Sequence, residues 1–174
     1  LRVDVRQDPH VVTSVSVTVK AGSDSAPAQG TWTWSARGWS YRYADGTFPT
    51  NTSKTIDGQV YRFDADGYMR TGWVFERGSW YYHALSGAQA TGWVLDGVSW
   101  YYLTPGTGQI ATGWVKDGSH WYYLNPANGK MKTGWHYEDG SWYYLKPGSG
   151  QMATGRLWIV WKYYRFSDNG TLIR

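Results

Sequence analysis

The sequence has no cysteine, and aliphatic side chains are sparse in its 174 residues. Without cysteine it forms no disulfide framework, thiol nucleophile or zinc–thiolate site. Its apolar runs fall well short of the roughly 20 residues that cross a bilayer, so no membrane span is expected. Net charge is only +4, from 17 Lys and Arg against 13 Asp and Glu. The basic residues are scattered singly, which argues against a nucleic-acid-binding tail.

Aromatic residues and glycine replace the missing aliphatic residues. The chain contains 13 Trp, 15 Tyr, 4 Phe and 22 Gly. Such a sequence is too aromatic to be disordered. It also lacks the Leu, Ile and Val that fill an ordinary core, so we expect the aromatic side chains to supply much of the buried surface.

A repeat of 20 to 21 residues organises the aromatic residues. The repeated Thr-Gly pairs are Thr71-Gly72, Thr91-Gly92, Thr112-Gly113, Thr133-Gly134 and Thr154-Gly155. In four units a Trp follows directly, and seven residues later a second Trp opens a Trp-Tyr-Tyr triplet. These Trp pairs are Trp73 and Trp80, Trp93 and Trp100, Trp114 and Trp121, and Trp135 and Trp142. A regular period of this length indicates a repeat architecture.

Each unit is predicted to be a β-hairpin followed by a second turn and a short extended stretch. The hairpin turns are expected at residues 77–78, 96–97, 117–118 and 139–140, the last three being Asp-Gly pairs, which are the strongest short-range hairpin signal. One hairpin is marginal in water, whereas stacked hairpins bury a continuous aromatic seam. The predicted fold class is therefore all-β, a solenoid of stacked β-hairpins.

The two ends of the repeat carry degenerate copies. Upstream, Trp32 and Trp39 keep the spacing of seven, whereas the next unit has Ser53 and Val60 at the two Trp positions. The last Thr-Gly pair is followed by Arg in place of Trp. Because atypical end units are expected in solenoids, we predict about seven hairpins over residues 31–174, with the first, second and last degenerate.

The N-terminal segment differs from the repeats. Residues 1–21 carry alternating valines and are predicted to be the tail of an upstream β-rich domain or a strand packed on the first hairpin. Residues 22–30 are rich in Ser, Ala, Gly and Pro and are predicted to be a linker. The chain starts at Leu1 without a signal segment, so we expect it to be a fragment of a longer protein.

The paired Trp residues are candidates for ligand binding. Strand alternation places the second Trp and the second Tyr of a unit on one face and the first Tyr on the other. Aromatic faces around a gap attract a quaternary ammonium ion by roughly 0.5–2 kcal/mol per face. The same rings can instead stack on sugars. Several weak equivalent sites suit a polymeric ligand, since linked binding raises avidity.

Other repeated side chains are expected to be structural. The core candidates are Tyr81, Tyr101, Tyr122, Tyr143, Leu103, Leu124 and Leu145. Most acids are expected at turns, namely Asp45, Asp57, Asp66, Asp96, Asp117 and Asp139. Glu76 and Glu138 are expected to be solvated on hairpin arms. The four histidines share no ligand spacing, so we expect no catalytic residue, metal site or cofactor within this chain. Whether a catalytic domain lies upstream of these repeats is left open by the sequence.

The pattern Gly-Trp-x6-Trp-Tyr-Tyr, followed by Gly-x-Met-x-Thr-Gly, resembles the cell-wall-binding, choline-binding and glucan-binding repeat family. The resemblance covers about residues 30–174 and is closest from Gly72 to Gly155. It implies a β-hairpin solenoid that anchors secreted proteins of Gram-positive bacteria, or of their phages, to the cell envelope. The implied location is extracellular and associated with the cell wall.

The resemblance also implies particular binding residues, because choline-binding members use two Trp of one hairpin and a Tyr of the next. Carried over, the sites are Trp73, Trp80 and Tyr102; Trp93, Trp100 and Tyr123; and Trp114, Trp121 and Tyr144. Trp135 and Trp142 form a further pair, and Met131 and Met152 occupy the family's apolar position. The choice of the second Tyr of each triplet is an inference from strand alternation.

The predicted function is a non-catalytic module that binds choline-substituted teichoic acid or a related envelope polymer. Two alternatives stay open, a glucan-binding module that uses the same Trp residues as sugar platforms and a structural stalk. In two units the second-Tyr position holds Arg62 or Arg165, and an Arg would repel a cation there. Nucleic acid is not an expected partner, because the repeat has a strict period and the sequence shows no basic groove.

Overall fold

The computed structural model describes residues 30–173, and every regular element within them is a β-strand. The predicted all-β class is confirmed, as seven antiparallel hairpins follow one another along this part of the chain. The predictions for residues 1–21 and for all but the last residue of the linker fall outside the described residues. Residues 30–173 also contain no helix that could serve as a membrane-spanning segment.

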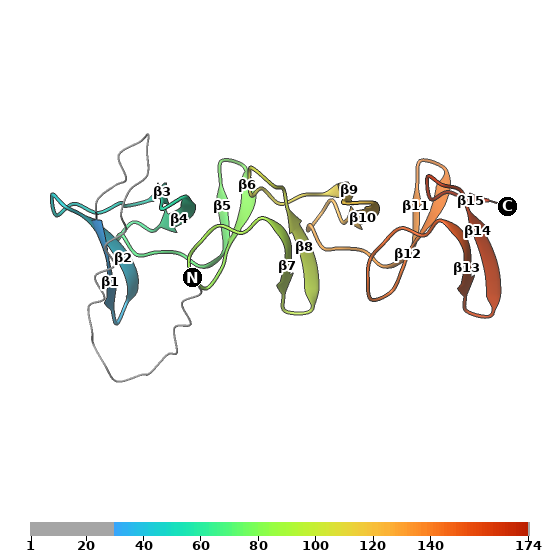
Figure 1. Cartoon of the computed structure of the whole chain (residues 1–174), viewed down its shortest axis with the longest axis horizontal. Helices are drawn as coiled ribbons and strands as arrows, with labels where there is room; N and C mark the ends of the chain where they lie inside the picture. The colour runs from blue at the N-terminus through green and yellow to red at the C-terminus, as the bar shows by residue number, and fades with distance from the viewer. Residues whose placement is uncertain (1–29, 174) are drawn as a thin grey trace. The chain divides into compact units, whose positions relative to one another are not determined.

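The hairpin arms are short strands of five or six residues, labelled in Figure 1. The hairpins are β1 (Gly30–Ser35) with β2 (Gly38–Tyr43), β3 (Thr52–Ile56) with β4 (Gln59–Phe63), β5 (Gly72–Glu76) with β6 (Ser79–His83), β7 (Gly92–Asp96) with β8 (Ser99–Leu103), β9 (Gly113–Asp117) with β10 (His120–Leu124), β11 (Gly134–Glu138) with β12 (Ser141–Leu145), and β13 (Gly155–Ile159) with β14 (Lys162–Phe166). A final short strand, β15 (Leu172–Ile173), pairs with β14.

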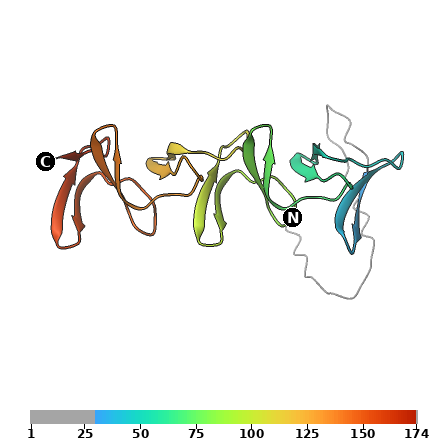
Figure 2. The ribbon, with the colours of Figure 1, turned by 180° about the vertical axis from the view of Figure 1, so that it is seen from behind.

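The described residues form two compact units, residues 30–74 with 83–89 and residues 75–82 with 90–173. In the second unit each hairpin points in a different direction from the hairpin before it, and β13–β14 points the same way as β7–β8 (Figures 1 and 2). Side chains at equivalent positions of successive hairpins therefore face different sides of this unit.

The hairpin turns are of two kinds. In β11–β12 the turn residues are Asp139 and Gly140, with φ of 48° and 77°. Positive φ at both central residues is typical of a type I′ turn, for which Asp-Gly is suited. The predicted turn position is correct here.

In β7–β8 and β9–β10 the turn lies one residue later than predicted. The turn residues are 97–98 and 118–119, and Asp96 and Asp117 are the last residues of their strands. Gly97 and Gly118 then take the first turn position with positive φ, where a type II′ turn favours glycine. The expectation that these two acids serve the turns is therefore wrong, and Asp117 is free to accept hydrogen bonds from side chains.

The extended stretch after each hairpin ties successive hairpins together in the second unit. The amide of Met131 donates to the carbonyl of Trp100 at 2.8 Å, and the amide of Lys132 donates to the carbonyl of Tyr123 at 2.8 Å. The stretch is thus bonded both to its own hairpin and to the hairpin before it. Ile110 and Met152 make the equivalent bonds to the carbonyls of Trp80 and Trp121. These bonds satisfy backbone groups that would otherwise lack partners.

The core of the second unit is formed by the residue that ends the second arm of each hairpin. Leu103, Leu124 and Leu145 are fully buried and Phe166 is 2% exposed, so the leucine prediction is confirmed. Among the predicted core tyrosines, Tyr101 and Tyr122 are buried and Tyr81 and Tyr143 are half-buried. In the first unit the same position holds Phe63 and His83, both buried.

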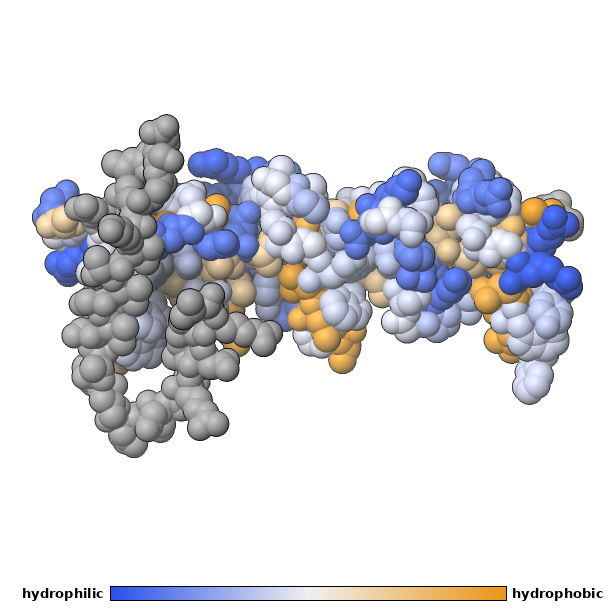
Figure 3. Space-filling view, viewed as in Figure 1, coloured by the Kyte–Doolittle hydropathy of each residue, from blue (hydrophilic) through white to orange (hydrophobic). Residues whose placement is uncertain are grey.

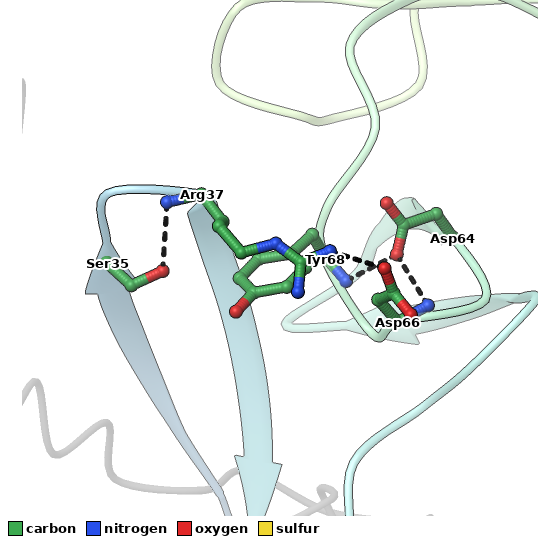
Figure 4. Close-up of polar contacts among 5 residues, drawn as sticks. All are labelled: Ser35, Arg37, Asp64, Asp66 and Tyr68. Carbon is green, nitrogen blue, oxygen red and sulfur yellow. Dashed lines mark hydrogen bonds and ion pairs between the residues drawn. The ribbon is translucent and has the colours of Figure 1, made fainter.

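In the first unit, Arg37 in the β1–β2 turn contacts the loop that follows β4 (Figure 4). Its guanidinium lies 4.7 Å from the centroid of the Tyr68 ring and forms an ion pair with Asp66. The carboxylate of Asp64 shapes that loop by accepting the amides of Asp66 and Tyr68 at 3.0 and 2.8 Å. The pair is exposed, so it fixes the position of the loop with little gain in stability.

Candidate ligand-binding clusters between hairpins

The first cluster in the second unit is the Trp93 cluster, defined as Trp93, Trp100, Tyr102 and Tyr122. The Trp93 ring lies 6.4 Å from Trp100, 5.0 Å from Tyr102 and 4.7 Å from Tyr122, measured between centroids. All three pairs are edge-to-face. Trp93 is half-buried, whereas 40% of Trp100 is exposed. The predicted proximity of the two Trp is therefore correct, and Trp100 is open to solvent.

The tyrosine that the next hairpin contributes is the first of its triplet, not the second. Tyr122 meets Trp93, whereas Tyr123 packs against Trp114 of its own hairpin, 5.1 Å between centroids. The reason is the alternation of faces along the strand. The second Tyr shares the face of its own Trp pair, which is the face toward the following hairpin, so the first Tyr is the one that faces the preceding hairpin.

The Trp114 cluster consists of Trp114, Tyr123, His136 and Tyr143. Tyr143, not the predicted Tyr144, comes from the next hairpin and lies 4.9 Å from Trp114. His136 lies 5.7 Å from Trp114 and 3.9 Å from Tyr123. The exposed second Trp of this unit, Trp121, has the ammonium group of Lys116 6.0 Å from its ring centroid.

The Trp135 cluster repeats the arrangement with Trp135, Trp142, Tyr144 and Tyr164. Trp135 lies 6.1 Å from Trp142, 5.0 Å from Tyr144 and 4.9 Å from Tyr164. The expectation that Arg165 would meet this Trp pair is wrong, because Tyr164 holds the position instead.

The first unit contains the same geometry around Trp32, although the neighbouring hairpin lacks both Trp. Trp32 lies 5.1 Å from Tyr41 and 4.8 Å from Tyr61. Tyr61, rather than Arg62, is the residue that the next hairpin contributes. Of the site predicted at Trp73, Trp80 and Tyr102, the structure places Tyr102 in the Trp93 cluster and Trp80 beside Phe75, at 5.2 Å.

Met131 and Met152 occupy equivalent positions after β10 and β12, and each lies under a glycine of the following turn. Met131 packs against the buried group formed by Tyr102, Tyr122 and Leu124. Gly150 covers Met131 so closely that a Cβ at Gly150 would lie 2.3 Å from the Met131 Sδ. Its φ of +71° also favours glycine. Met152 lies under Gly170 in the same way. Both methionines are therefore held at fixed positions by the following turn.

Two carboxylates join the clusters, and sequence reasoning missed both. Asp117 accepts the Trp93 indole N–H at 2.9 Å and the Tyr102 hydroxyl at 3.4 Å. Glu138 accepts the Trp114 indole N–H at 2.5 Å and the Tyr123 hydroxyl at 2.8 Å. The expectation that Glu138 is solvated is wrong, since its side chain is only 31% exposed. The available signal was an acid 24 residues after the first Trp in both units.

These hydrogen bonds change the titration of the groups involved. Burial would raise the pKa of Glu138, but the hydrogen bonds donated by Tyr123 and Trp114 outweigh burial, and the pKa is lowered. Burial raises the pKa of Tyr102 and of Tyr123, and the neighbouring carboxylate raises each further. Glu138 therefore stays ionised, and Tyr102 and Tyr123 stay protonated, at neutral pH.

His136 is a buried imidazole at the third position of its strand, where β7 and β9 carry Val94 and Val115. Burial lowers its pKa, and the ammonium of Lys132, 3.1 Å from its Nδ1, lowers it further. Its Nε2 is buried without a hydrogen bond, 3.6 Å from a Glu138 oxygen. The neutral imidazole is therefore the form that the fold accommodates.

The clusters hold no arrangement suited to metal chemistry. Within residues 30–173 no three His, Asp or Glu side chains are grouped so that they could hold a metal ion. What the clusters offer is aromatic rings packed edge to face, an exposed Trp in the Trp93 and Trp135 clusters, and a carboxylate behind the rings in the Trp93 and Trp114 clusters. This combination suits an organic cation or a sugar rather than acid–base or nucleophilic chemistry.

Comparison with known families places this chemistry in a known class of repeat. A choline-binding repeat family matches residues 50–88 and 111–157, and a cell wall binding repeat family matches residues 91–108. The repeats of this chain belong to the choline-binding and cell-wall-binding repeat family. No curated protein matches the sequence.

Solved structures similar to this chain include two proteins of Streptococcus pneumoniae and an endolysin of phage Cp-1. The chain is similar to choline-binding protein F in the presence of a peptidoglycan analogue, at 34% identity and a TM-score of 0.74 over 83% of this chain and 52% of that one. It is equally similar to CbpJ, at 35% identity and a TM-score of 0.74 over 82% and 51%. The pneumococcal cell wall endolysin of phage Cp-1, complexed with choline, matches at 36% identity and a TM-score of 0.56 over 77% and 40%. The chain thus spans about half the length of the first two structures.

Proposed function

We propose that this chain is a cell-wall-anchoring module that binds choline groups of an envelope polymer. Each site consists of the half-buried Trp and the exposed Trp of one hairpin together with the first Tyr of the next hairpin. The module acts at the cell surface and performs no chemistry on its ligand. An enzymatic activity, if the full-length protein has one, belongs to another part of it.

The observation that carries this proposal is the repetition of one ring geometry. In the Trp93 and Trp135 clusters, the first Trp lies between 4.7 and 6.4 Å from three other rings, all edge-to-face. Rings at right angles present several electron-rich faces to one small volume, which suits a trimethylammonium group that cannot donate hydrogen bonds. A structural stalk needs no exposed Trp, yet Trp100 and Trp142 are 40% and 46% exposed.

The carboxylates strengthen the case for a cation. Asp117 places a negative charge at the edge of the Trp93 indole, and Glu138 does the same for Trp114. A carboxylate that accepts an indole N–H raises the negative potential around the ring, so that a cation at the ring face is attracted more strongly. A glucan carries no charge and would not gain this electrostatic attraction.

Comparison with relatives supports the same ligand. The phage Cp-1 endolysin was solved with choline and choline-binding protein F with a peptidoglycan analogue. Because successive hairpins of the second unit face different sides, one polymer chain could engage several clusters in turn. Linked binding of this kind raises the overall affinity well above that of a single weak site.

The test is a choline titration followed by the indole N–H resonances of individual Trp residues. We expect saturable shifts for Trp93, Trp100, Trp135 and Trp142, with maltose and dextran as parallel arms. Trp100→Ala should abolish the response of Trp93, whereas the control Trp161→Ala removes a ring that is 87% exposed and lies outside the clusters. A response to dextran but not to choline would overturn the choline proposal in favour of a glucan-binding module. If the indole resonances shift with none of choline, maltose and dextran, the structural stalk would be favoured.

A further inference from the structure

The β13–β14 hairpin differs from the hairpins before it in the face that it exposes. Its inner face carries Leu157, Ile159, Tyr164 and Phe166, which pack with Trp135 and Tyr144 in one apolar cluster. Its outer face is defined here as Arg156, Trp158, Tyr163 and Arg165, all exposed to solvent. The inner face packs as in the hairpins before it, with Ile159 in the place of Asp117, whereas the outer face differs more strongly in its chemistry.

The change replaces an aromatic pair by two positive charges. At the equivalent position of β9–β10, Trp114 lies opposite Tyr123, whereas here Arg156 lies opposite Arg165. Directly opposed side chains in an antiparallel pair have Cβ atoms about 4.5–5.5 Å apart, and like charges at that distance are destabilising. Neither guanidinium has an ion-pair partner within residues 30–173. No acidic side chain of the described residues therefore neutralises the two charges.

Aromatic rings frame the two arginines. Trp158 and Tyr163 lie opposite each other with ring centroids 4.5 Å apart, and they are 53% and 61% exposed. The Arg156 guanidinium lies 5.3 Å from the Tyr163 centroid, which orients it on the same face. In Figure 3 strongly hydrophilic surface lies over this hairpin, next to paler surface at its tip.

The turn adds a further exposed ring at an energetic cost. Val160 and Trp161 have φ of 36° and 68°, whereas β11–β12 uses Asp-Gly at these positions. A β-branched residue at positive φ is strained. Trp161 is 87% exposed, so the strain is not offset by burial of its ring. Strain of this sort is found preferentially at functional sites.

We propose that the outer face of β13–β14 binds a phosphate-bearing sugar of an anionic glycan. Paired guanidinium groups bind phosphate with short, charge-assisted and often bidentate hydrogen bonds. The Trp158 and Tyr163 rings stack on the apolar face of the attached sugar. Resting on the proposed function, the module then recognises one envelope polymer by two opposite charges, the ammonium in the aromatic clusters and the phosphate on this hairpin.

The experiment uses the full chain and four probes, namely choline chloride, choline-free poly(glycerol phosphate), glucose 1-phosphate and inorganic phosphate. We expect Arg156→Gln with Arg165→Gln to weaken binding of poly(glycerol phosphate) at least about tenfold, since each lost hydrogen bond is charge-assisted. The matched control, Lys54→Gln with Lys130→Gln, removes the same charge from exposed positions elsewhere and should change this affinity less than about twofold. Choline titrations should be unchanged in both double variants.

A second comparison tests the sugar. Glucose 1-phosphate should bind several-fold more tightly than inorganic phosphate, and Trp158→Ala should remove that difference while leaving inorganic phosphate binding in place. Equal losses in the arginine and lysine double variants would reduce the effect to net charge and overturn the proposal. So would concentration-dependent self-association that is lost in the arginine variant, because the face would then be an interface between copies. A failed choline titration with an intact phosphate response would instead refute the proposed function alone.

Discussion

The Trp93 and Trp135 clusters have nearly the same rings in nearly the same places, but they differ behind the rings. The three ring distances are 6.4, 5.0 and 4.7 Å in the Trp93 cluster and 6.1, 5.0 and 4.9 Å in the Trp135 cluster. The Trp93 indole donates to Asp117. The equivalent residue on β13 is Ile159, which is buried in the apolar cluster around Phe166.

The comparison shows that the ring geometry of a cluster and its charge vary independently of each other. Ring geometry is set by strand register and by the Trp and Tyr positions, and it survives exchange of an acid for an aliphatic side chain. Charge is set by one residue, the last of the following hairpin's first strand. The first unit agrees with this interpretation. Ile56, the last residue of β3, holds the equivalent position beside the Trp32, Tyr41 and Tyr61 rings. The acid therefore tunes a site that the rings have already built.

The largest expected effect comes from removing the first Trp of either cluster. Trp93→Ala and Trp135→Ala should each lower the free energy of unfolding by about 3–4 kcal/mol, because the ring joins two hairpins. Trp93→Ala should cost about 1 kcal/mol more, since it also removes the hydrogen bond to Asp117. Urea denaturation followed by circular dichroism measures both.

The matched control for these variants is Trp161→Ala. Its ring is 87% exposed, so we expect a change within about 0.5 kcal/mol. If Trp93→Ala and Trp161→Ala were equally mild, the half-buried ring would not be what holds the hairpins together.

The next largest effect comes from exchanging the residue behind the rings. Asp117→Ile should cost about 1–3 kcal/mol of stability, because the Trp93 indole N–H and the Tyr102 hydroxyl lose their acceptor. Choline affinity at the Trp93 cluster should fall by about fivefold to tenfold as the nearby negative charge is removed. Indole N–H resonances during a choline titration measure this site separately from the others.

The reverse change, Ile159→Asp, sharpens the comparison. It gives the Trp135 indole an acceptor and should raise choline affinity at the Trp135 cluster, at a cost in stability for placing an acid in an apolar cluster. An unchanged affinity in both exchange variants would show that the carboxylate serves only the fold.

The pH dependence of stability should distinguish the Trp114 cluster, which contains His136, from the Trp93 cluster, which has Val115 at that position. Because burial lowers the pKa of His136, the folded state binds its proton less readily than the unfolded state does. This contribution to stability is complete above pH 6.5 and is lost as pH falls from there toward the lowered pKa. The slope is at most about 1.4 kcal/mol per pH unit for one proton.

The measurement is the difference in unfolding free energy between the chain and His136→Val from pH 7.5 to pH 5. This window lies above the lowered pKa of Glu138, whose own contribution falls off below pH 4.5. Subtraction also cancels the other histidines. A difference that does not depend on pH would mean that the folded protein accepts the protonated imidazole without cost.

The smallest expected effect comes from removing charge without removing the acceptor. Asp117→Asn keeps an oxygen for the Trp93 indole, so stability should change by less than about 1 kcal/mol. Choline affinity at this cluster should fall by about twofold to fourfold, and the loss should shrink at high salt because a partly exposed charge is screened. The Trp135 cluster of the same molecule is the internal control, and a loss that salt does not affect would contradict a charge effect.

Much of this architecture could be read from the sequence. The Thr-Gly period located the hairpins, the leucines that follow three of the four triplets are fully buried, and the pairs of Trp lie within ring contact in two clusters. These features follow from local rules, namely the two-residue alternation of a strand and the turn preference of glycine.

Other features could not be read from the period. The first Tyr, not the second, faces the preceding hairpin, because the direction in which a hairpin presents its two faces depends on how it packs. The turn lies at residues 97–98 rather than at the predicted 96–97. A type I′ turn at 96–97 and a type II′ turn at 97–98 are both compatible with the sequence, so the sequence could not decide between them.

The sequence by itself determined the repeat, the all-β class and the buried leucines of the core, since these depend on neighbours along the strand. The tertiary structure decided which rings meet across hairpins. It also brought Asp117 to the Trp93 indole and Glu138 to the Trp114 indole, each 24 residues apart in the sequence. Such contacts depend on the rotation from one hairpin to the next, which the linking stretch fixes through its hydrogen bonds to both hairpins. The same rotation leaves Arg156 and Arg165 on an open face, where a repeat of the usual sequence would carry aromatic rings.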